Sequence, residues 1–243
     1  MIEPKIIYVD KRFLAIDKPA ALMVHAARIS SKRRVDEEKR AEPTLVDWLL
    51  KNYPEVKTVG DDPVLRPGIV HRLDKDTSGV MLVARDQHTF AYLKEQFQKH
   101  LVKKIYLALV TGIPKKKSGV IDAPIGIKNG TLKRSIHSKK MAKEAVTEYR
   151  VIKKFAGEGS GKTSGNGSAS RALLEVRPRT GRTHQIRVHL GSIGHPILGD
   201  RLYGQKKQEG RLMLHARSIE FTDEDGKRFT FEADIPASFG DTR

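Results

Sequence analysis

Residues 71–84 read HRLDKDTSGVMLVA, a stretch that joins a polar cluster to an apolar run. The run from Val80 to Ala84 is continuously apolar, which predicts a buried strand. The nine residues before it hold two carboxylates, three cations and two hydroxyls. A polar cluster at the mouth of a strand is where a scaffold usually presents reactive groups. The alternative is a turn whose Asp, Ser and Gly residues only cap backbone groups.

Further strands and helices are predicted on both sides of this stretch. Apolar runs and turn residues predict strands over 6–9, 13–16, 105–110, 145–152, 172–176, 212–221 and 229–235, the first two forming a hairpin across residues 10–12. Helix signals predict a short helix capped by Thr44, with Leu45, Trp48 and Leu49 on one face, and a second capped by Asp86, with Phe90, Leu93 and Phe97. A third helix is predicted over 182–193, with Ile186, Leu190 and Ile193 buried.

Strands outnumber helices, and no alternating pattern with a Gly-rich phosphate loop occurs. The sequence therefore predicts an α+β class with a mixed, largely antiparallel sheet. The length of 243 residues suits one domain with a substantial core. Residues 28–43, nearly all charged or small, are predicted to form an exposed loop. Residues 157–170 contain five Gly and four Ser, which predicts a flexible loop between two strands.

The charge points to a polyanionic partner. The chain has 46 Lys and Arg against 29 Asp and Glu, a formal net charge of +17. Such an excess favours nucleic acid as the partner, although a basic surface can also serve solubility alone. Residues 128–143, with six Lys or Arg and one His, form a candidate RNA-contacting loop or an ordinary solvated one.

Composition and hydropathy exclude several classes of functional site and of targeting segment. The absence of cysteine excludes disulfides, thiolate zinc sites and a cysteine nucleophile. The first residues, MIEPKIIYVDKRF, lack the apolar core of a signal peptide, and no apolar run approaches a membrane span. The histidines fit no clear zinc spacing, so no metal and no cofactor are expected. The working prediction is a cytoplasmic protein, with a monomer as the simplest state.

Two further polar segments carry candidate site residues. Residues 180–190, TGRTHQIRVHL, place Arg182 beside His189 and His184 beside Arg187 at helical spacings. Arg187 adjoins the buried face and so needs an anion, of which the obvious one is a carboxylate such as Asp74. The alternative is a solvated basic helix. Residues 194–204, GHPILGDRLYG, form a defined turn whose polar groups can simply hold loop geometry.

These segments together resemble the RluA-type pseudouridine synthases, which modify ribosomal and transfer RNA. The resemblance rests on HRLDKDTSG at 71–79, AIDKPAALMVH at 15–25, KKIYLALV at 103–110, TGRTHQIRVHL, GHPILGDRLYG and RLMLHA at 211–216, in the family's order. It covers roughly residues 13–236. It implies a sheet of two half-sheets with an RNA cleft across its middle. About seventy residues precede the signature, which suggests the compact form without an N-terminal RNA-binding domain.

The resemblance also implies roles for individual residues. Asp74 matches the catalytic aspartate, Tyr106 the tyrosine that stacks on the target base, and Arg187 the arginine that pairs with the aspartate. Arg72 resembles the arginine that helps to extrude the base, and Leu214 would pack against the base or the tyrosine. The remaining candidates for substrate binding, from the same motifs, are His71, Thr77, Arg182, His184 and Gln185.

The implied reaction isomerises uridine to pseudouridine in an RNA stem-loop. No electrons are transferred and no outside group is consumed, which agrees with a sequence that lacks cofactor motifs. An aspartate suits the task as nucleophile or as base, and the sequence leaves open which it is. Two other readings share the charge. One is a non-catalytic RNA-binding or chaperone protein on the same fold, and the other is a nuclease, which would usually need a metal-binding carboxylate set.

Overall fold

The computed structural model describes residues 3–26, 42–128, 133–156, 170–204 and 210–240. These form two compact units, each described separately below. The first consists of residues 1–102 and 220–233, and the second of residues 103–219 and 234–243. The α+β class predicted from the sequence is confirmed, because strands dominate both units and few helices accompany them.

The first unit contains the predicted N-terminal hairpin. Strand β1 (Lys5–Val9) pairs antiparallel with β2 (Phe13–Lys18), which pairs antiparallel with β3 (Ser78–Ala84). Every residue of β3 is buried, as its continuous apolar run predicted. Strand β11 (Arg228–Glu232) pairs with β10 (Leu214–Thr222), whose last residues belong to this unit. A cluster of five rings fills the core between these strands: Tyr8, Phe13, Phe221, Phe229 and Phe231.

The helices of the first unit begin where the sequence predicts. Helix α1 (Leu45–Asn52) has Thr44 as its N-cap, and Asp47 completes a capping box with it. Helix α2 (Gln87–Gln98) is capped by the Asp86 side chain, which accepts from the Thr89 backbone N–H. A 3-10 turn, η1 (Pro54–Thr58), follows α1, so the helix ends just before Pro54.

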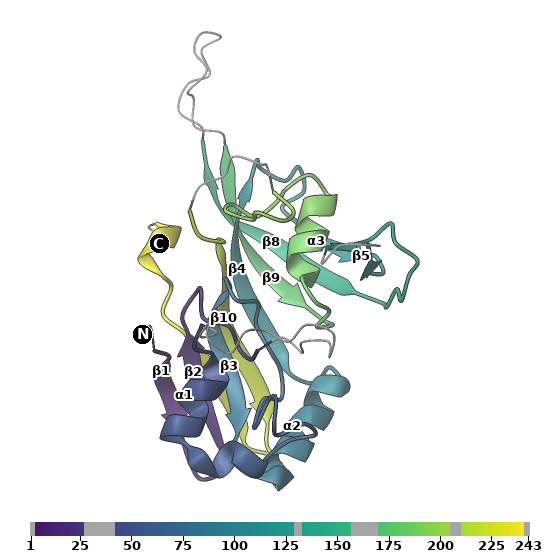
Figure 1. Ribbon diagram of the computed structural model, residues 1–243. Helices are drawn as coiled ribbons and strands as arrows, with labels where there is room; N and C mark the ends of the chain where they lie inside the picture. Colours follow the sequence, from purple (N-terminus) through teal and green to yellow (C-terminus); the bar gives the residue numbers. More distant parts are fainter. Residues whose placement is uncertain (1–2, 27–41, 129–132, 157–169, 205–209, 241–243) are drawn as a thin grey trace, which may run out of the picture. The chain divides into compact units, whose positions relative to one another are not determined.

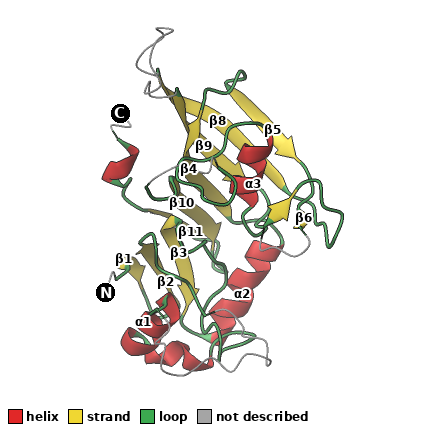
Figure 2. Cartoon of the chain, turned by 45° about the horizontal axis from the view of Figure 1, so that its top comes forward, coloured by secondary structure: helices red, strands yellow, loops and turns green. Residues whose placement is uncertain are grey.

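Four neighbouring antiparallel strands form most of the sheet in the second unit. Their order is β4 (Lys103–Thr111), β9 (Arg171–Pro178), β8 (Val146–Phe155) and β5 (Ser118–Asp122). Helix α3 (Gln185–Ser192) packs on β8 and β9, and Figure 1 and Figure 2 both show it lying over these strands. In a second small sheet, β6 (Gly126–Ile127), just before the segment predicted as a basic loop, pairs with β7 (Arg134–Ser135) inside that segment. A short 3-10 turn, η2 (Ala237–Phe239), buries Phe239 in this unit's core.

Some predicted boundaries were wrong. The third helix begins at Gln185, not at residue 182, and Ile193 lies beyond its end with 38% of its surface exposed. The last strand ends at Glu232 instead of residue 235. The predicted loop over 28–43 falls outside the described residues apart from positions 42–43, and so does the Gly/Ser segment apart from residue 170.

Candidate functional site

Asp74 lies in the turn that leads into β3 of the first unit. Its backbone carbonyl accepts a hydrogen bond of 3.1 Å from the N–H of Thr77, which closes the turn. The Thr77 residue is only 2% exposed, whereas Asp74 is half-buried. The turn therefore rests on a buried residue and keeps the aspartate within reach of solvent.

The ammonium group of Lys18 binds backbone carbonyls, one of them in the same turn. It donates to the carbonyls of Pro19 at 2.7 Å, Leu22 at 2.8 Å and Lys75 at 3.0 Å, and the residue is fully buried. A buried ammonium requires acceptors for its three protons, and three carbonyls supply them. Lys18 thus ties the AIDKPAALMVH segment to the residue that follows Asp74. Sequence reasoning missed this role, although a lysine at the end of a buried strand was the visible signal.

His71 and Arg72 make local contacts within the first unit. The Nε2 atom of His71 accepts the N–H of Leu82 at 2.9 Å, and its ring stacks on Phe97 at 4.4 Å between centroids. Exposed Arg72 donates from Nη1 to Nε2 of His25 at 2.9 Å.

His25 is kept neutral by its surroundings. Its Nδ1 lies 2.8 Å from the Ala26 carbonyl, and its Nε2 accepts from Arg72, a pattern that fits a neutral imidazole with the proton on Nδ1. Burial lowers the pKa of His25, and the charges of Arg72 and Arg66 lower it further. His25 therefore serves Arg72 as a hydrogen-bond acceptor and not as a second cation.

Tyr106 lies in β4 of the second unit. It is half-buried, packs against the hydrophobic core and stands opposite Val176 of β9. Leu214, at the start of β10, is 4% exposed and belongs to the same core. Both side chains are therefore supported by packing within one unit.

Gln185 sets the start of helix α3. Its Oε1 accepts from the Thr180 hydroxyl at 2.6 Å and the Arg182 N–H at 3.0 Å. Its Nε2 donates to the Val146 carbonyl and the Thr147 hydroxyl, both at 3.0 Å. All four hydrogen-bonding positions of this buried amide are used within the protein. The side chain therefore holds residues 180–184 as a turn, which is why the helix begins later than predicted.

The predicted neighbours Arg182 and His189 do not share a helix. His184 precedes the helix with a left-handed φ of 58°, and Arg182 lies in the turn, where its Nε donates to the Glu144 carbonyl at 2.9 Å. His189 is fully buried between the Thr147 hydroxyl at 2.9 Å and the Ala123 carbonyl at 3.0 Å. Burial lowers the pKa of His189, although the Ala123 contact opposes this. The prediction that Arg182 lies beside His189 on one helix was wrong.

The carboxylate partner of Arg187 is Asp200, a residue of the turn predicted over 194–204. Its Nε and Nη2 atoms bind Asp200 Oδ2 at 2.8 Å and Oδ1 at 2.9 Å, and the two side chains are 8% and 0% exposed. The prediction that Arg187 needs a buried anion is confirmed for Asp200. Because this pair uses one edge of the planar guanidinium, the Nη1 edge points elsewhere.

Asp200 is held as a carboxylate. Burial alone would raise its pKa, but the hydrogen bond and charge of Arg187 and the N–H groups of Tyr203 and Leu202 outweigh that effect, so the pKa lies below its usual 3.8. Gly199 lets the backbone of Arg211 approach the turn that carries Asp200. Its φ is +73°, and a Cβ there would lie 1.9 Å from the carbonyl oxygen of Arg211.

Tyr203 completes this arrangement. Arg187 lies over its ring, with the guanidinium carbon 5.3 Å from the centroid. Its hydroxyl lies 2.9 Å from His184 Nδ1 and accepts the N–H of Arg134 at 2.9 Å. The ring therefore connects the helix, the turn before it and the small β6–β7 sheet.

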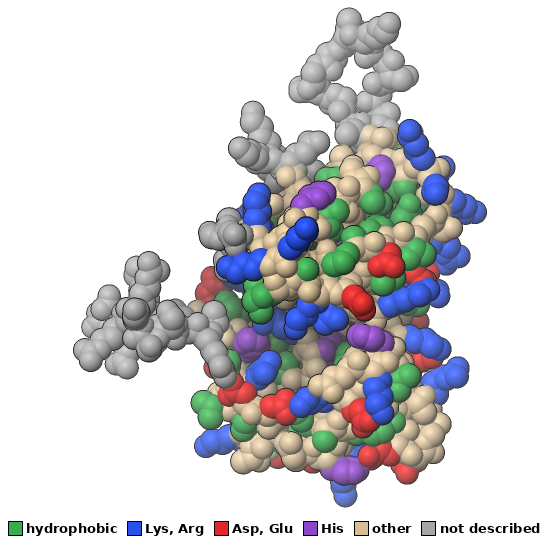
Figure 3. Space-filling view, turned by 90° about the vertical axis from the view of Figure 1, so that its right-hand side faces the viewer, with side chains coloured by type: hydrophobic (Ala, Val, Ile, Leu, Met, Phe, Trp, Pro, Cys, Tyr) green, Lys and Arg blue, Asp and Glu red, His purple; other side chains and the backbone are tan. Residues whose placement is uncertain are grey.

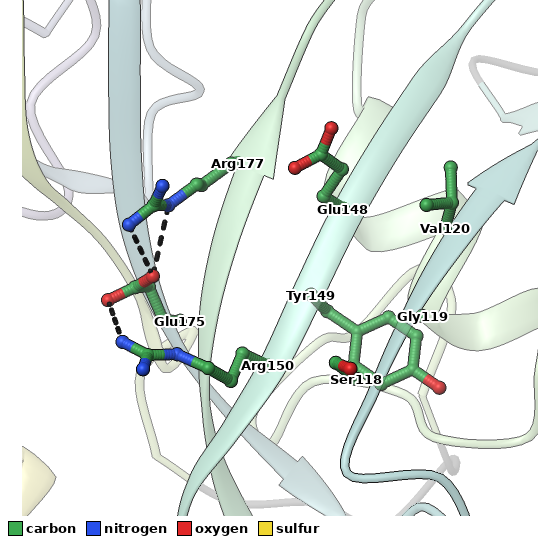
Figure 4. Close-up of a pocket in the computed structure, with 8 residues that line it drawn as sticks. All are labelled: Ser118, Gly119, Val120, Glu148, Tyr149, Arg150, Glu175 and Arg177. Carbon is green, nitrogen blue, oxygen red and sulfur yellow. Dashed lines mark hydrogen bonds and ion pairs between the residues drawn. The ribbon is translucent and has the colours of Figure 1, made fainter.

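The outer face of the β5–β8–β9 sheet carries a shallow pocket with no predicted site residue (Figure 4). Glu175 binds Arg150 at 3.1 Å and Arg177 at 2.9 Å, so these two cations already have an anion. Gly119 lies under the ring of Tyr149, because a Cβ there would come within 2.8 Å of a ring carbon. This pocket contributes nothing to the candidate site.

Lys and Arg side chains are spread over the face of the molecule in Figure 3, in keeping with the charge of +17. No group of three or more His, Cys, Asp or Glu that could hold a metal occurs in the described part of the chain. Among the helices that the structure describes, none combines the length and apolarity needed to cross a bilayer.

Comparison with known proteins identifies the family. The family model described as RNA pseudouridylate synthase matches residues 12–192. An uncharacterized RNA pseudouridine synthase of Zymomonas mobilis is 36% identical, with 99% of this chain and 98% of that protein covered. Ribosomal large subunit pseudouridine synthase D of Pseudomonas aeruginosa is also 36% identical, with 98% of this chain and 70% of that protein covered. An uncharacterized relative from Aquifex aeolicus is 40% identical over 83% of this chain, which spans 56% of that protein.

A solved structure shows the same fold. Human RNA pseudouridylate synthase domain containing 4 superimposes with a TM-score of 0.69 at 26% identity, over 98% of this chain and 91% of that one. The family model alone covers most of the chain and includes the turn of Asp74, the strand of Tyr106 and the helix of Arg187. The chain belongs to the RNA pseudouridylate synthase family, whose members are isomerases.

Proposed function

We propose that the protein isomerises uridine to pseudouridine in RNA, with Asp74 as the catalytic carboxylate. The proposal rests on the turn at 71–79, in which Asp74 is only half-buried and the buried Lys18 ammonium binds the carbonyl of the next residue, Lys75. A carboxylate on a fixed support suits nucleophilic or base chemistry at the ribose or the base. The glycosidic bond to nitrogen 1 breaks and a bond from ribose to carbon 5 forms.

Tyr106 and Arg187 are proposed to act with Asp74. Tyr106 offers a half-buried ring on which a base can stack. Arg187 is a planar cation that Asp200 holds in place, and a cation beside the catalytic carboxylate would favour its ionised form. We expect Arg187→Lys to lose most turnover, because a planar fork is replaced by a point charge. Normal turnover of that variant would argue against this role.

The other predicted residues divide into two proposed groups. Arg72, exposed beside His25, is available to help extrude the base, and Arg182 keeps guanidinium nitrogens for phosphate. His71, Thr77, His184, Gln185 and Leu214 are engaged in hydrogen bonds or core packing, so we propose that they shape the substrate surface from behind.

The proposed substrate is a structured RNA, with ribosomal RNA favoured over transfer RNA. Support comes from the net charge of +17 and from the names of the relatives described as ribosomal large subunit synthases. The target base must leave its stack to react, which costs a few kcal/mol. Phosphate contacts offset that cost, so affinity should fall steeply with salt. A stem-loop target, a cytoplasmic location and a monomeric state remain predictions.

The test is pseudouridine mapping on purified ribosomal and transfer RNA lacking the modification. Asp74→Asn should fold and bind RNA but form no product, whereas the matched control Asp76→Asn, at an exposed position two residues away, should keep activity. Product from Asp74→Asn at the wild-type rate would remove Asp74 from the proposed role. If the wild type bound RNA but formed no product, a non-catalytic RNA-binding protein would be favoured. Cleavage of the RNA would favour a nuclease.

A further inference from the structure

Lys104 lies on β4 two residues before Tyr106. Alternate residues of a strand point to the same face, so Lys104 and Tyr106 share one face while Lys103 points to the other. Tyr106 pairs with Val176 of β9, and Val176 pairs with Tyr149 of β8. Residues paired across neighbouring strands point to the same side of a sheet, so Val176 and Tyr149 lie on the same face as Lys104 and Tyr106.

This face is the one that helix α3 covers. The hydroxyl of Thr147, two residues before Tyr149 on β8, accepts one hydrogen bond from Gln185 and lies 2.9 Å from His189 Nδ1. Lys104 is therefore on the same side of the sheet as the helix that carries Arg187. Figure 1 shows α3 over this side of β8 and β9.

Lys104 differs from Lys18 and Arg187, the two buried cations of the described residues. Lys18 donates to three carbonyls, and Arg187 binds Asp200. Lys104 is partly buried, yet within the described residues it has no hydrogen-bond or ion-pair partner. Desolvation lowers its pKa to about 8, and no carboxylate in the described part of the chain opposes that effect. A cation taken partly out of water without an acceptor is costly unless an anion arrives with a ligand.

We propose that Lys104 binds a phosphodiester group of the RNA strand next to the target uridine. The inference rests on the proposed function, in which Tyr106 stacks on the base. Residues two apart on a strand are separated by about 7 Å, a span that a base and its own phosphate can cover. Phosphate is the anion that an RNA partner supplies in quantity, and a lysine binds it as a point charge.

The test measures the affinity of the full chain for an in vitro transcribed, uridine-containing RNA stem-loop at several salt concentrations. Lys104→Met should weaken binding at least about tenfold and reduce the slope of log affinity against log salt by about 0.7 to 1. Lys104→Arg should restore binding and turnover, because it keeps the charge. Lys103→Met, on the opposite face of the same strand, is the matched control and should stay within twofold of wild type.

Each other outcome overturns the inference. Lys104→Met with wild-type affinity and salt slope shows that no phosphate is bound there. Lys104→Arg that binds RNA normally but loses turnover shows a proton-transfer role instead. Absence of binding by the wild type also refutes it. Should Lys104→Met fail to fold, titration of the wild-type lysines by NMR replaces it, and RNA must then raise the pKa of Lys104.

Failure of this inference is distinct from failure of the proposed function. Binding is measured in the Asp74→Asn background as well as in wild type, so it does not depend on catalysis. If no pseudouridine forms but Lys104→Met still weakens binding, only the proposed function fails. If the wild type forms pseudouridine and Lys104→Met binds normally, only the inference about Lys104 fails.

Discussion

Removal of the Asp200 carboxylate should strongly destabilise the second unit. In Asp200→Ala, Arg187 stays buried without its anion, and the N–H groups of Leu202 and Tyr203 lose an acceptor. Breaking a buried ion pair by removing one partner costs about 3–5 kcal/mol. For a chain of this size, about 1 kcal/mol corresponds to about 2–4 °C, so the melting temperature should fall by about 6–20 °C.

The assay is urea unfolding followed by fluorescence, with thermal melting in parallel. The matched control is Glu148→Ala in the same unit, which breaks an ion pair with Arg179 whose side chains are 34% and 64% exposed. Exposed pairs contribute about 0–1 kcal/mol, so this variant should remain near wild type.

A double variant separates the ion pair from the loss of side-chain volume. Arg187→Met combined with Asp200→Ala removes both charges, so it should be less destabilised than the sum of the two single variants. Additive effects, or a loss below about 1 kcal/mol in Asp200→Ala, would refute the reasoning that the pair is buried and coupled.

The contribution of Asp200 also has a defined pH dependence. Its folded-state pKa lies below the ordinary 3.8, so the stabilisation is present above that value and is lost as the pH falls through the folded pKa. The difference between wild type and Asp200→Ala should therefore shrink in acid and stay constant near neutral pH. A difference that grows in acid would contradict the sign.

Three further predictions concern other contacts. Lys18→Met leaves three carbonyls without their donor, so turnover should fall at least about tenfold while RNA affinity changes less than about threefold; equal loss of both would mean general unfolding. Gly119→Ala should destabilise by about 1–3 kcal/mol by displacing Tyr149, and Tyr149→Ala should relieve most of that loss; no relief would place the strain elsewhere. NMR of the free protein should find Lys104 titrating near pH 8, well below the exposed lysines, and an ordinary value would show that it is solvated.

Local patterns predicted most elements correctly because their signals lie within a few residues. The apolar run before Arg85 became a fully buried strand, and the caps at Thr44 and Asp86 start their helices as expected. Such features depend on periodicity and on side chains that bond to the backbone nearby. The family motifs, likewise contiguous in the chain, were readable for the same reason.

Helix α3 shows where local reasoning failed. Its pattern suggested one buried stripe and a polar face, but Gln185, Arg187 and His189 are buried as well. Each is satisfied by a group distant in sequence: Gln185 by Val146 and Thr147, Arg187 by Asp200, and His189 by Ala123. A polar residue can be buried wherever the fold supplies partners, and no local period encodes those partners.

Local sequence patterns were enough to predict most of the strands, the helix caps at Thr44 and Asp86, the basic charge and the motif residues Asp74, Tyr106 and Arg187. The packing of distant segments brings Lys18 to the carbonyl of Lys75, 57 positions away, and Asp200 to Arg187. It also decided that Lys104 is partly buried without a partner among the described residues. The physical reason is that hydrogen bonding and desolvation depend on which segments meet in space, whereas strand and helix preferences depend on neighbours along the chain.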